Sequence, residues 1–175
     1  MAGRHLLFVG LSGSGKSTVG QIVAEELGAT LFDIDMLLVR QMGMPVSQMF
    51  GMLGEPGFRR MERDAVTAAW AAEGPSVIVP GAGWASQPGH MEAGKARSLT
   101  FYLQCAPAVA ARRLAGGEVR PLLAGADPEA RLEALLKERE PFFRLADYEV
   151  AAGKRSAAEV AAEVTSLARR HGGWQ

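Results

Sequence analysis

A glycine-rich motif between a short apolar run and an amphipathic segment constrains the fold of this chain more than any other feature. Residues Gly10–Ser17 (GLSGSGKS) match the pattern G-x-x-x-x-G-K-[ST]. The apolar run His5–Val9 before the motif is typical of a buried strand, and the apolar spacing after it predicts a helix over Lys16–Leu27. A glycine-rich turn that joins such a strand to such a helix directs backbone N–H groups at phosphate oxygens. The sequence therefore predicts an α/β domain that binds a nucleoside triphosphate.

Apolar runs and helical patterns alternate along the rest of the chain. Four more strands are predicted at Thr30–Asp33, Ser76–Val79, Leu99–Leu103 and Tyr148–Ala151. Four more helices are predicted at Gly57–Ala72, Pro107–Leu114, Pro128–Arg144 and Ala157–Arg170. Strands that are apolar throughout are expected where helices cover both faces of a parallel sheet. Two glycine- and proline-rich stretches, Pro80–Gly94 and Ala115–Pro128, are either binding loops or lids, or long surface connections.

Composition limits the partners and the compartment. The 175 residues carry 19 basic and 19 acidic side chains, a balance that argues against binding to nucleic acid or to an anionic membrane through a positive field. One cysteine, Cys105, excludes an internal disulfide, and the apolar stretch Leu6–Leu11 is too short for a signal peptide. We expect a cytoplasmic, single-domain protein over residues 1–175, and the zero net charge favours a monomer.

The remaining motifs decide which class of nucleotide-binding protein this is. The chain has no asparagine, and none of its five aspartates is followed three residues later by glycine, so the usual GTPase motifs are absent. A small kinase remains. For ATP, we predict contacts from Gly13, Ser14, Gly15, Lys16, Ser17 and Thr18. Among these, Lys16 bridges the β- and γ-phosphates and the Ser17 hydroxyl ligates Mg²⁺.

From the phosphate-binding loop onward, the order of motifs resembles the shikimate kinase family. The matching segments are Gly10–Ser17, Phe32–Asp35, Gly54-Glu55, Phe58–Arg60 with Glu62, Gly81–Gly83, Arg120–Leu123, and Arg139 followed by Pro141 and Phe143. The resemblance implies a three-layer αβα kinase of the nucleoside-monophosphate-kinase type, with a five-stranded parallel sheet. It also implies substrate-binding helices at about residues 33–62 and a lid at about residues 115–128. The implied reaction, a step of aromatic amino acid biosynthesis, moves the γ-phosphate of ATP to the 3-hydroxyl of shikimate.

Two aspartates follow the second predicted strand. Ligands collect at this end of an open α/β sheet, and on an extended backbone Asp33 and Asp35 point to opposite faces, which suits separate roles. The resemblance implies that Asp35 holds the substrate hydroxyl and accepts its proton, while Asp33 holds Mg²⁺ through water. The structural alternative is that either aspartate caps a helix over Met36–Val39.

Arginines carry the predicted recognition of the acid and of the transferred group. The resemblance assigns Arg59 and Arg139 to the shikimate carboxylate, which suits their planar, bidentate donors. Glu62, one helical turn after Arg59, is placed to orient that guanidinium. Arginine is also simply the usual cation of this chain, with 15 Arg against 4 Lys.

The lid and the base-binding side are assigned through the resemblance as well. It gives Arg120 of the lid a contact with the transferring phosphoryl group. It also places Arg113 and the loop containing Arg155 on the two sides of the adenine. Arg112 is an alternative for stacking on the base, and Lys154 a plain surface charge.

The segment after the third strand departs from the family pattern of three glycines. Here Gly81, Ala82 and Gly83, assigned by the resemblance to the substrate, are preceded at Val79 by a residue without a hydroxyl and followed by Trp84. A positive φ at Ala82 would cost about 1–2 kcal/mol. Trp84 narrows the pocket, stacks on a different ligand, or simply packs. These departures keep two alternatives open, namely a sister kinase for another small hydroxylated acid such as gluconate, and a non-catalytic nucleotide-binding homologue.

Overall fold

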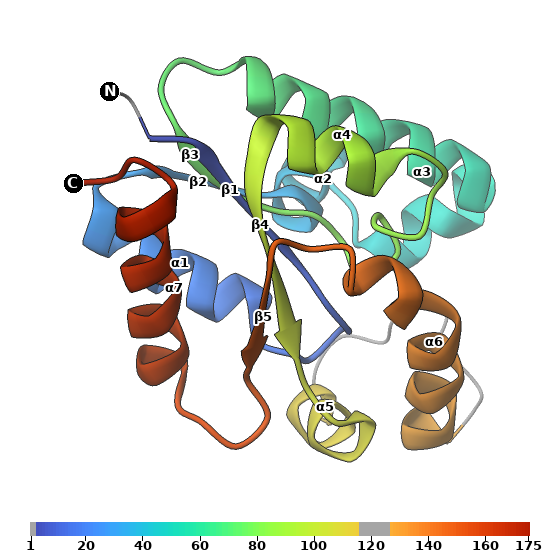
Figure 1. Cartoon of the computed structure of the whole chain (residues 1–175). Coiled ribbons are helices and arrows are strands. Elements are labelled where there is room, and N and C mark those ends of the chain that lie inside the picture. Colours follow the sequence, from blue (N-terminus) through green and yellow to red (C-terminus); the bar gives the residue numbers. More distant parts are fainter. Residues whose placement is uncertain (1–2, 116–126) are drawn as a thin grey trace.

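Five parallel strands form one sheet in the computed structural model of the chain, which describes residues 3–115 and 127–175 (Figure 1). Across the sheet the strands run in the order β2-β3-β1-β4-β5, and every neighbouring pair is parallel. Their bounds are β1 His5–Val9, β2 Thr30–Asp33, β3 Ser76–Val79, β4 Ser98–Gln104 and β5 Tyr148–Ala151. Each predicted strand is confirmed, and β4 is one residue longer than expected at each end.

Helices cover both faces of the sheet, which explains why the inner strands β1, β3 and β4 are mostly buried. Alternate residues of β1 point to opposite faces, so Leu6 and Phe8 pack toward α1 (Lys16–Leu27) and α7 (Ala157–His171). Leu7 and Val9 pack on the other side, against the helices between β2 and β5. The molecule is therefore the predicted three-layer αβα arrangement, with α1 and α7 on one face (Figure 1).

Within residues 3–115 and 127–175, five helices lie on the second face. They are α2 Ile34–Met42, α3 Val46–Ala71, α4 His90–Arg97, α5 Pro107–Leu114 and α6 Pro128–Phe143. The predictions for α1 and α5 are exact, while α6 ends one residue earlier and α7 one residue later than expected. Of all the helices described, none combines the length and the apolar character needed to cross a bilayer.

Apolar spacing did not predict α4, nor did it predict α2 and the first half of α3, although the helix-cap alternative for Asp33 anticipates α2 and the resemblance implies helices over about residues 33–62. The predicted helix start at Gly57 reflects a real break, because Gly54 takes φ 68° and ψ 170° and Pro56 follows it. Helix α4 begins inside the segment interpreted as a loop, Pro80–Gly94. Its Gly94 is a poor helix former, but a Cβ there would lie 3.2 Å from the Trp84 ring, so tertiary packing overrides local propensity.

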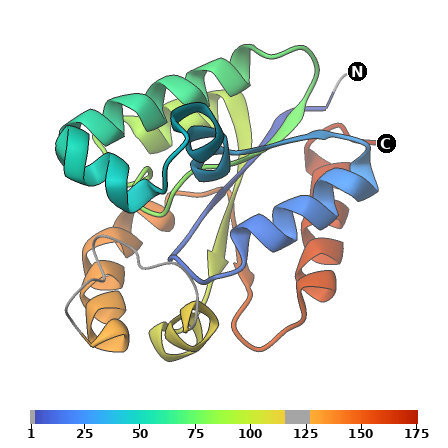
Figure 2. The same ribbon diagram turned by 180° about the vertical axis from the view of Figure 1, so that it is seen from behind.

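Arg4 and the segment after α7 meet at the amino-terminal ends of the strands, away from the phosphate-binding loop (Figure 2). The Arg4 backbone N–H donates to the Gly172 carbonyl, and the Trp174 indole donates to the Arg4 carbonyl. The carboxyl ends of the strands are thereby left to the loops that carry the candidate site.

Candidate active site

The phosphate-binding loop connects β1 to α1 through three glycines with positive φ. Gly10, Gly13 and Gly15 take φ values of 147°, 81° and 94°. A Cβ at Gly10 would lie 2.6 Å from the Leu103 carbonyl oxygen, so the loop also needs the close approach that glycine permits. Buried Lys16 donates from Nζ to the carbonyls of Gly10 and Leu11, each at 2.7 Å. The loop is thus curled around the start of α1, where backbone N–H groups and the helix dipole favour an anion.

The two aspartates differ in local structure. Asp33 is the N-cap of α2, and its Oδ1 accepts from the Met36 N–H at 3.5 Å, so the helix-cap interpretation holds for Asp33. Asp35 lies in the first turn of α2, so the expectation of two opposed side chains on an extended backbone is wrong. The chain is helical from Ile34, because the Asp33 cap starts the helix directly at the strand end.

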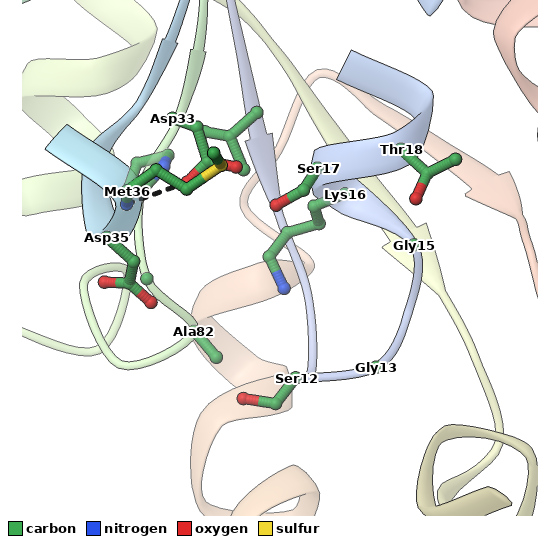
Figure 3. A pocket seen from close by; sticks show the side chains of 13 residues that line it. Ser12, Gly13, Gly15, Lys16, Ser17, Thr18, Asp33, Asp35, Met36 and Ala82 are labelled. Carbon is green, nitrogen blue, oxygen red and sulfur yellow. Dashed lines mark hydrogen bonds between the residues drawn. The ribbon is translucent and has the colours of Figure 1, made fainter. Parts of the chain in front are cut away.

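One cavity of about 230 Å³ joins the loop to these aspartates (Figure 3). Its lining consists of loop, strand-end and helix residues, namely Ser12, Gly13, Gly15, Lys16, Ser17, Thr18, Asp33, Asp35, Met36, Val79, Pro80, Gly81 and Ala82. In the part of the chain that the structure describes, no group of three or more His, Cys, Asp or Glu side chains is placed to hold a metal. Ser17 and Asp33 nevertheless offer a hydroxyl and a carboxylate, the oxygen donors that Mg²⁺ takes when it arrives with a nucleotide.

Close approach, not backbone strain, explains the glycines after β3. A Cβ at Gly81 would lie 2.4 Å from Glu62 Oε2, and one at Gly83 would lie 2.2 Å from Arg59 Nη2. No residue other than glycine has a positive φ in residues 3–115 and 127–175, so Ala82 carries none of the anticipated strain. The departure from three glycines is therefore accommodated by the backbone, with the Ala82 methyl on the cavity wall.

A buried ion pair lies beneath these glycines. Arg59 Nη1 donates to Glu62 Oε1 at 2.9 Å, and the Gly81 N–H donates to Glu62 Oε2 at 3.1 Å. The Glu62 side chain is fully buried, and the Arg59 guanidinium also lies 5.5 Å from the Phe58 ring centroid. These contacts confirm that Glu62 orients Arg59.

The surroundings of Glu62 favour the neutral, protonated form of its carboxyl group. Burial raises the pKa of the Glu62 carboxyl to about 7, and the nearby charge of Asp35 pushes it in the same direction. The Arg59 charge and the hydrogen bonds from Arg59 and Gly81 oppose this rise without cancelling it. The Glu62 carboxyl therefore titrates near neutral pH.

Arg139 lies on α6 with its side chain buried. Burial lowers the pKa of its guanidinium, and the positive charge of Arg59 lowers it further, so the two cations are near one another. Two largely buried guanidiniums that repel each other favour the binding of an anion such as a carboxylate. Arg60 and Arg63, by contrast, are exposed, as expected of surface charges.

A second cavity, of about 310 Å³, lies on the other side of the phosphate-binding loop. Arg113 and Arg155 line it together with Ser14, Gly15, Thr18, Val19, Ala152, Ser156, Ala157 and Val160. Arg113 donates to the carbonyls of Ser14 at 3.2 Å and Ala152 at 3.0 Å. It thereby ties the loop to the end of β5. Arg112 and Lys154 do not line this cavity.

Several residues singled out from the sequence pack into the core or are not described. Trp84 is buried against Trp70 and His90, with ring centroids 6.1 and 4.9 Å away, so of its three interpretations packing is correct. Cys105 is a buried residue just after β4. Arg120 and most of the predicted lid lie outside the described residues.

Four residues of the first cavity are absent from the predicted site, namely Ser12, Met36, Val79 and Pro80. Ser12 stands at a variable position inside the glycine-rich motif, and that position was the only available signal. Met36 is followed by apolar residues and gave no signal beyond its place after Asp35.

Comparisons with known proteins agree with this geometry. The family model described as shikimate kinase matches residues 12–169. A shikimate kinase of Caldanaerobacter subterraneus subsp. tengcongensis is 37% identical over 161 residues, which cover 92% of this chain and 94% of that protein. The structure of a shikimate kinase from Acinetobacter baumannii in complex with shikimate is 30% identical, with a TM-score of 0.90 over 95% of this chain and 93% of that one. A gluconokinase from Sinorhizobium meliloti, 19% identical with a TM-score of 0.64 over 97% of this chain and 94% of that one, shares the fold alone.

Proposed function

Because this chain belongs to the shikimate kinase family, we propose that it transfers the γ-phosphoryl group of ATP to the 3-hydroxyl of shikimate, giving shikimate 3-phosphate and ADP. The observation that carries the proposal is the cavity of about 230 Å³ in which the phosphate-binding loop faces Asp35, together with the largely buried guanidiniums of Arg59 and Arg139, which repel each other electrostatically. A donor site, a hydroxyl acceptor site and a carboxylate site are the three parts that this reaction needs.

The phosphate-binding loop and α1 bind ATP, the phosphoryl donor. Backbone N–H groups of Gly13 to Thr18 hold the phosphates, and Lys16 bridges the β- and γ-phosphates. Ser17 and Asp33 would hold the Mg²⁺ that arrives with ATP, Asp33 through water, and the ion would neutralise charge on the phosphates. Arg113 and Arg155 enclose the adenine in the second cavity, which Ser14, Gly15 and Thr18 also line.

The acceptor side holds the acid at one end and its hydroxyl at the other. Arg59 and Arg139 bind the carboxylate, and Glu62 keeps the Arg59 guanidinium in place through its 2.9 Å contact. Gly81, Ala82 and Gly83 let the substrate approach the backbone closely. Asp35 then accepts the proton of the hydroxyl as the phosphoryl group arrives. Positioning both reactants accounts for much of the rate, and Arg120 from the lid adds positive charge on the transferring group.

The first experiment measures ADP release by the purified protein with Mg-ATP. We expect a rate of about 1–100 s⁻¹ that depends on shikimate. Gluconate and a shikimate analogue lacking the 3-hydroxyl serve as matched acids, and neither should raise the rate above the substrate-free background. A gluconate-dependent rate would instead support the sister-kinase alternative, and a rate that no acid increases would support a nucleotide-binding homologue.

The location and assembly of the protein rest on its sequence. We infer that the enzyme acts in the cytoplasm. We also infer that it acts as a monomer, because one chain carries both the donor and the acceptor residues of the proposed reaction. Size-exclusion chromatography coupled to light scattering would test the monomer, for which 18.6 kDa is expected.

A further inference from the structure

The Ser12 hydroxyl has no role in holding the phosphate-binding loop together. It lines the first cavity, half-buried, and makes no hydrogen bond to any other residue in the described parts of the chain. Ser14, two residues later, behaves differently, because its side chain is buried and its Oγ lies 3.5 Å from Lys16 Nζ. The loop therefore turns one serine inward for its own structure and the other toward the cavity.

The position of Ser12 within the cavity is informative. In Figure 3 its side chain stands on the wall formed by the loop, with its oxygen toward the side where Ala82 and Asp35 lie. Lys16, on the same wall, points its amine into the space between Ser12 and Ser17. A phosphoryl group that passes from a nucleotide on the loop to a hydroxyl held at Asp35 crosses this same cavity of about 230 Å³.

We propose that the Ser12 hydroxyl donates a hydrogen bond to the γ-phosphoryl group of ATP and retains it during transfer to the acceptor, an inference that rests on the proposed function. A hydroxyl rotates freely to follow an oxygen that moves between donor and acceptor, and hydrogen bonds to charged phosphate oxygens are stronger than neutral ones. The turn at Gly13, closed by the Ser14 N–H bond to the Leu11 carbonyl, fixes the backbone position of Ser12 before the nucleotide arrives, and only the hydroxyl rotates.

The test compares Ser12→Ala with the unchanged protein in binding and in turnover. Titration calorimetry with Mg-ATP and Mg-ADP, without any acid substrate, should show weaker binding of ATP by about tenfold, with ADP binding within about twofold. In the coupled assay with shikimate, kcat/KM for ATP should fall by about tenfold or more. Ser12→Thr, which keeps the hydroxyl, should recover most of the ATP affinity.

The matched control is Ser166→Ala, which removes an exposed hydroxyl from α7 at a position that lines neither cavity. It should leave both nucleotide affinities and turnover unchanged. ATP and ADP affinities of Ser12→Ala that stay within twofold of the unchanged protein, or that fall by the same factor, would overturn the proposal. Because binding is measured without an acid, the result stands even when no acid is phosphorylated, so the two proposals fail separately.

Discussion

Ionisation of the buried Glu62 should make the stability of this protein fall as pH rises from 5 to 8. The pKa of the Glu62 carboxyl is about 7 in the folded chain, against an ordinary value of 4.5. Between pH 4.5 and pH 7 the folded state therefore holds a proton that the unfolded state has lost. A folded state that binds more protons than the unfolded state loses stability as pH increases. A difference of this size corresponds to about 3 kcal/mol, since each unit of pKa is worth about 1.4 kcal/mol.

The assay is denaturant unfolding of the protein and of Glu62→Gln at pH 5 and pH 8. The amide cannot ionise, so the pH-dependent loss of about 3 kcal/mol should largely disappear in the variant. Glu55→Gln is the matched control, because Glu55 also contacts Arg59, at 3.4 Å, but is about half exposed. Its pH dependence should match that of the unchanged protein. The same pH dependence in Glu62→Gln and the unchanged protein would refute the reasoning.

Three further substitutions test the proposed site. Arg139→Ala should weaken binding of the acid by about 2–5 kcal/mol in calorimetry, with little change for ATP, since it removes one half of the carboxylate clamp. Arg120→Ala should lower kcat at least about tenfold in steady-state turnover, as expected for a lid cation that acts on the transferring group. Gly83→Ala should raise KM for the acid about tenfold or more, because its Cβ would lie 2.2 Å from Arg59 Nη2 and displace the guanidinium.

Each of these predictions has an outcome that contradicts it. Equal losses of acid and ATP binding in Arg139→Ala would indicate misfolding or a misassigned site. An unchanged kcat would remove Arg120 from the reaction. Gly51→Ala is the control for Gly83→Ala, because a Cβ at Gly51 meets nothing within 4 Å. Equal kinetics in the two variants would show that the close approach at Gly83 does not affect binding of the acid.

Much of the scaffold follows from local sequence patterns. The runs that became β1 and β2, and the apolar spacing that became α1, gave boundaries that agree with the structure to the residue. These elements are short, uninterrupted and bounded by glycine or by capping residues. Helix α4 escaped prediction because glycine at position 94 disfavours a helix locally, while the Trp84 ring occupies the space that any side chain there would need.

The sequence by itself determined the strand–loop–helix order and the phosphate-binding loop, because both depend on residues within about twenty positions of one another. Only the tertiary structure decided that Ala82 is unstrained, that Trp84 packs in the core, and that Glu62 exchanges a proton near neutral pH. Glu62 on α3, Asp35 on α2 and Gly81 after β3 are separated along the chain and meet only when these three elements pack together. The burial and the charges that shift the pKa of Glu62 exist only in that packed arrangement, so no local pattern encodes them.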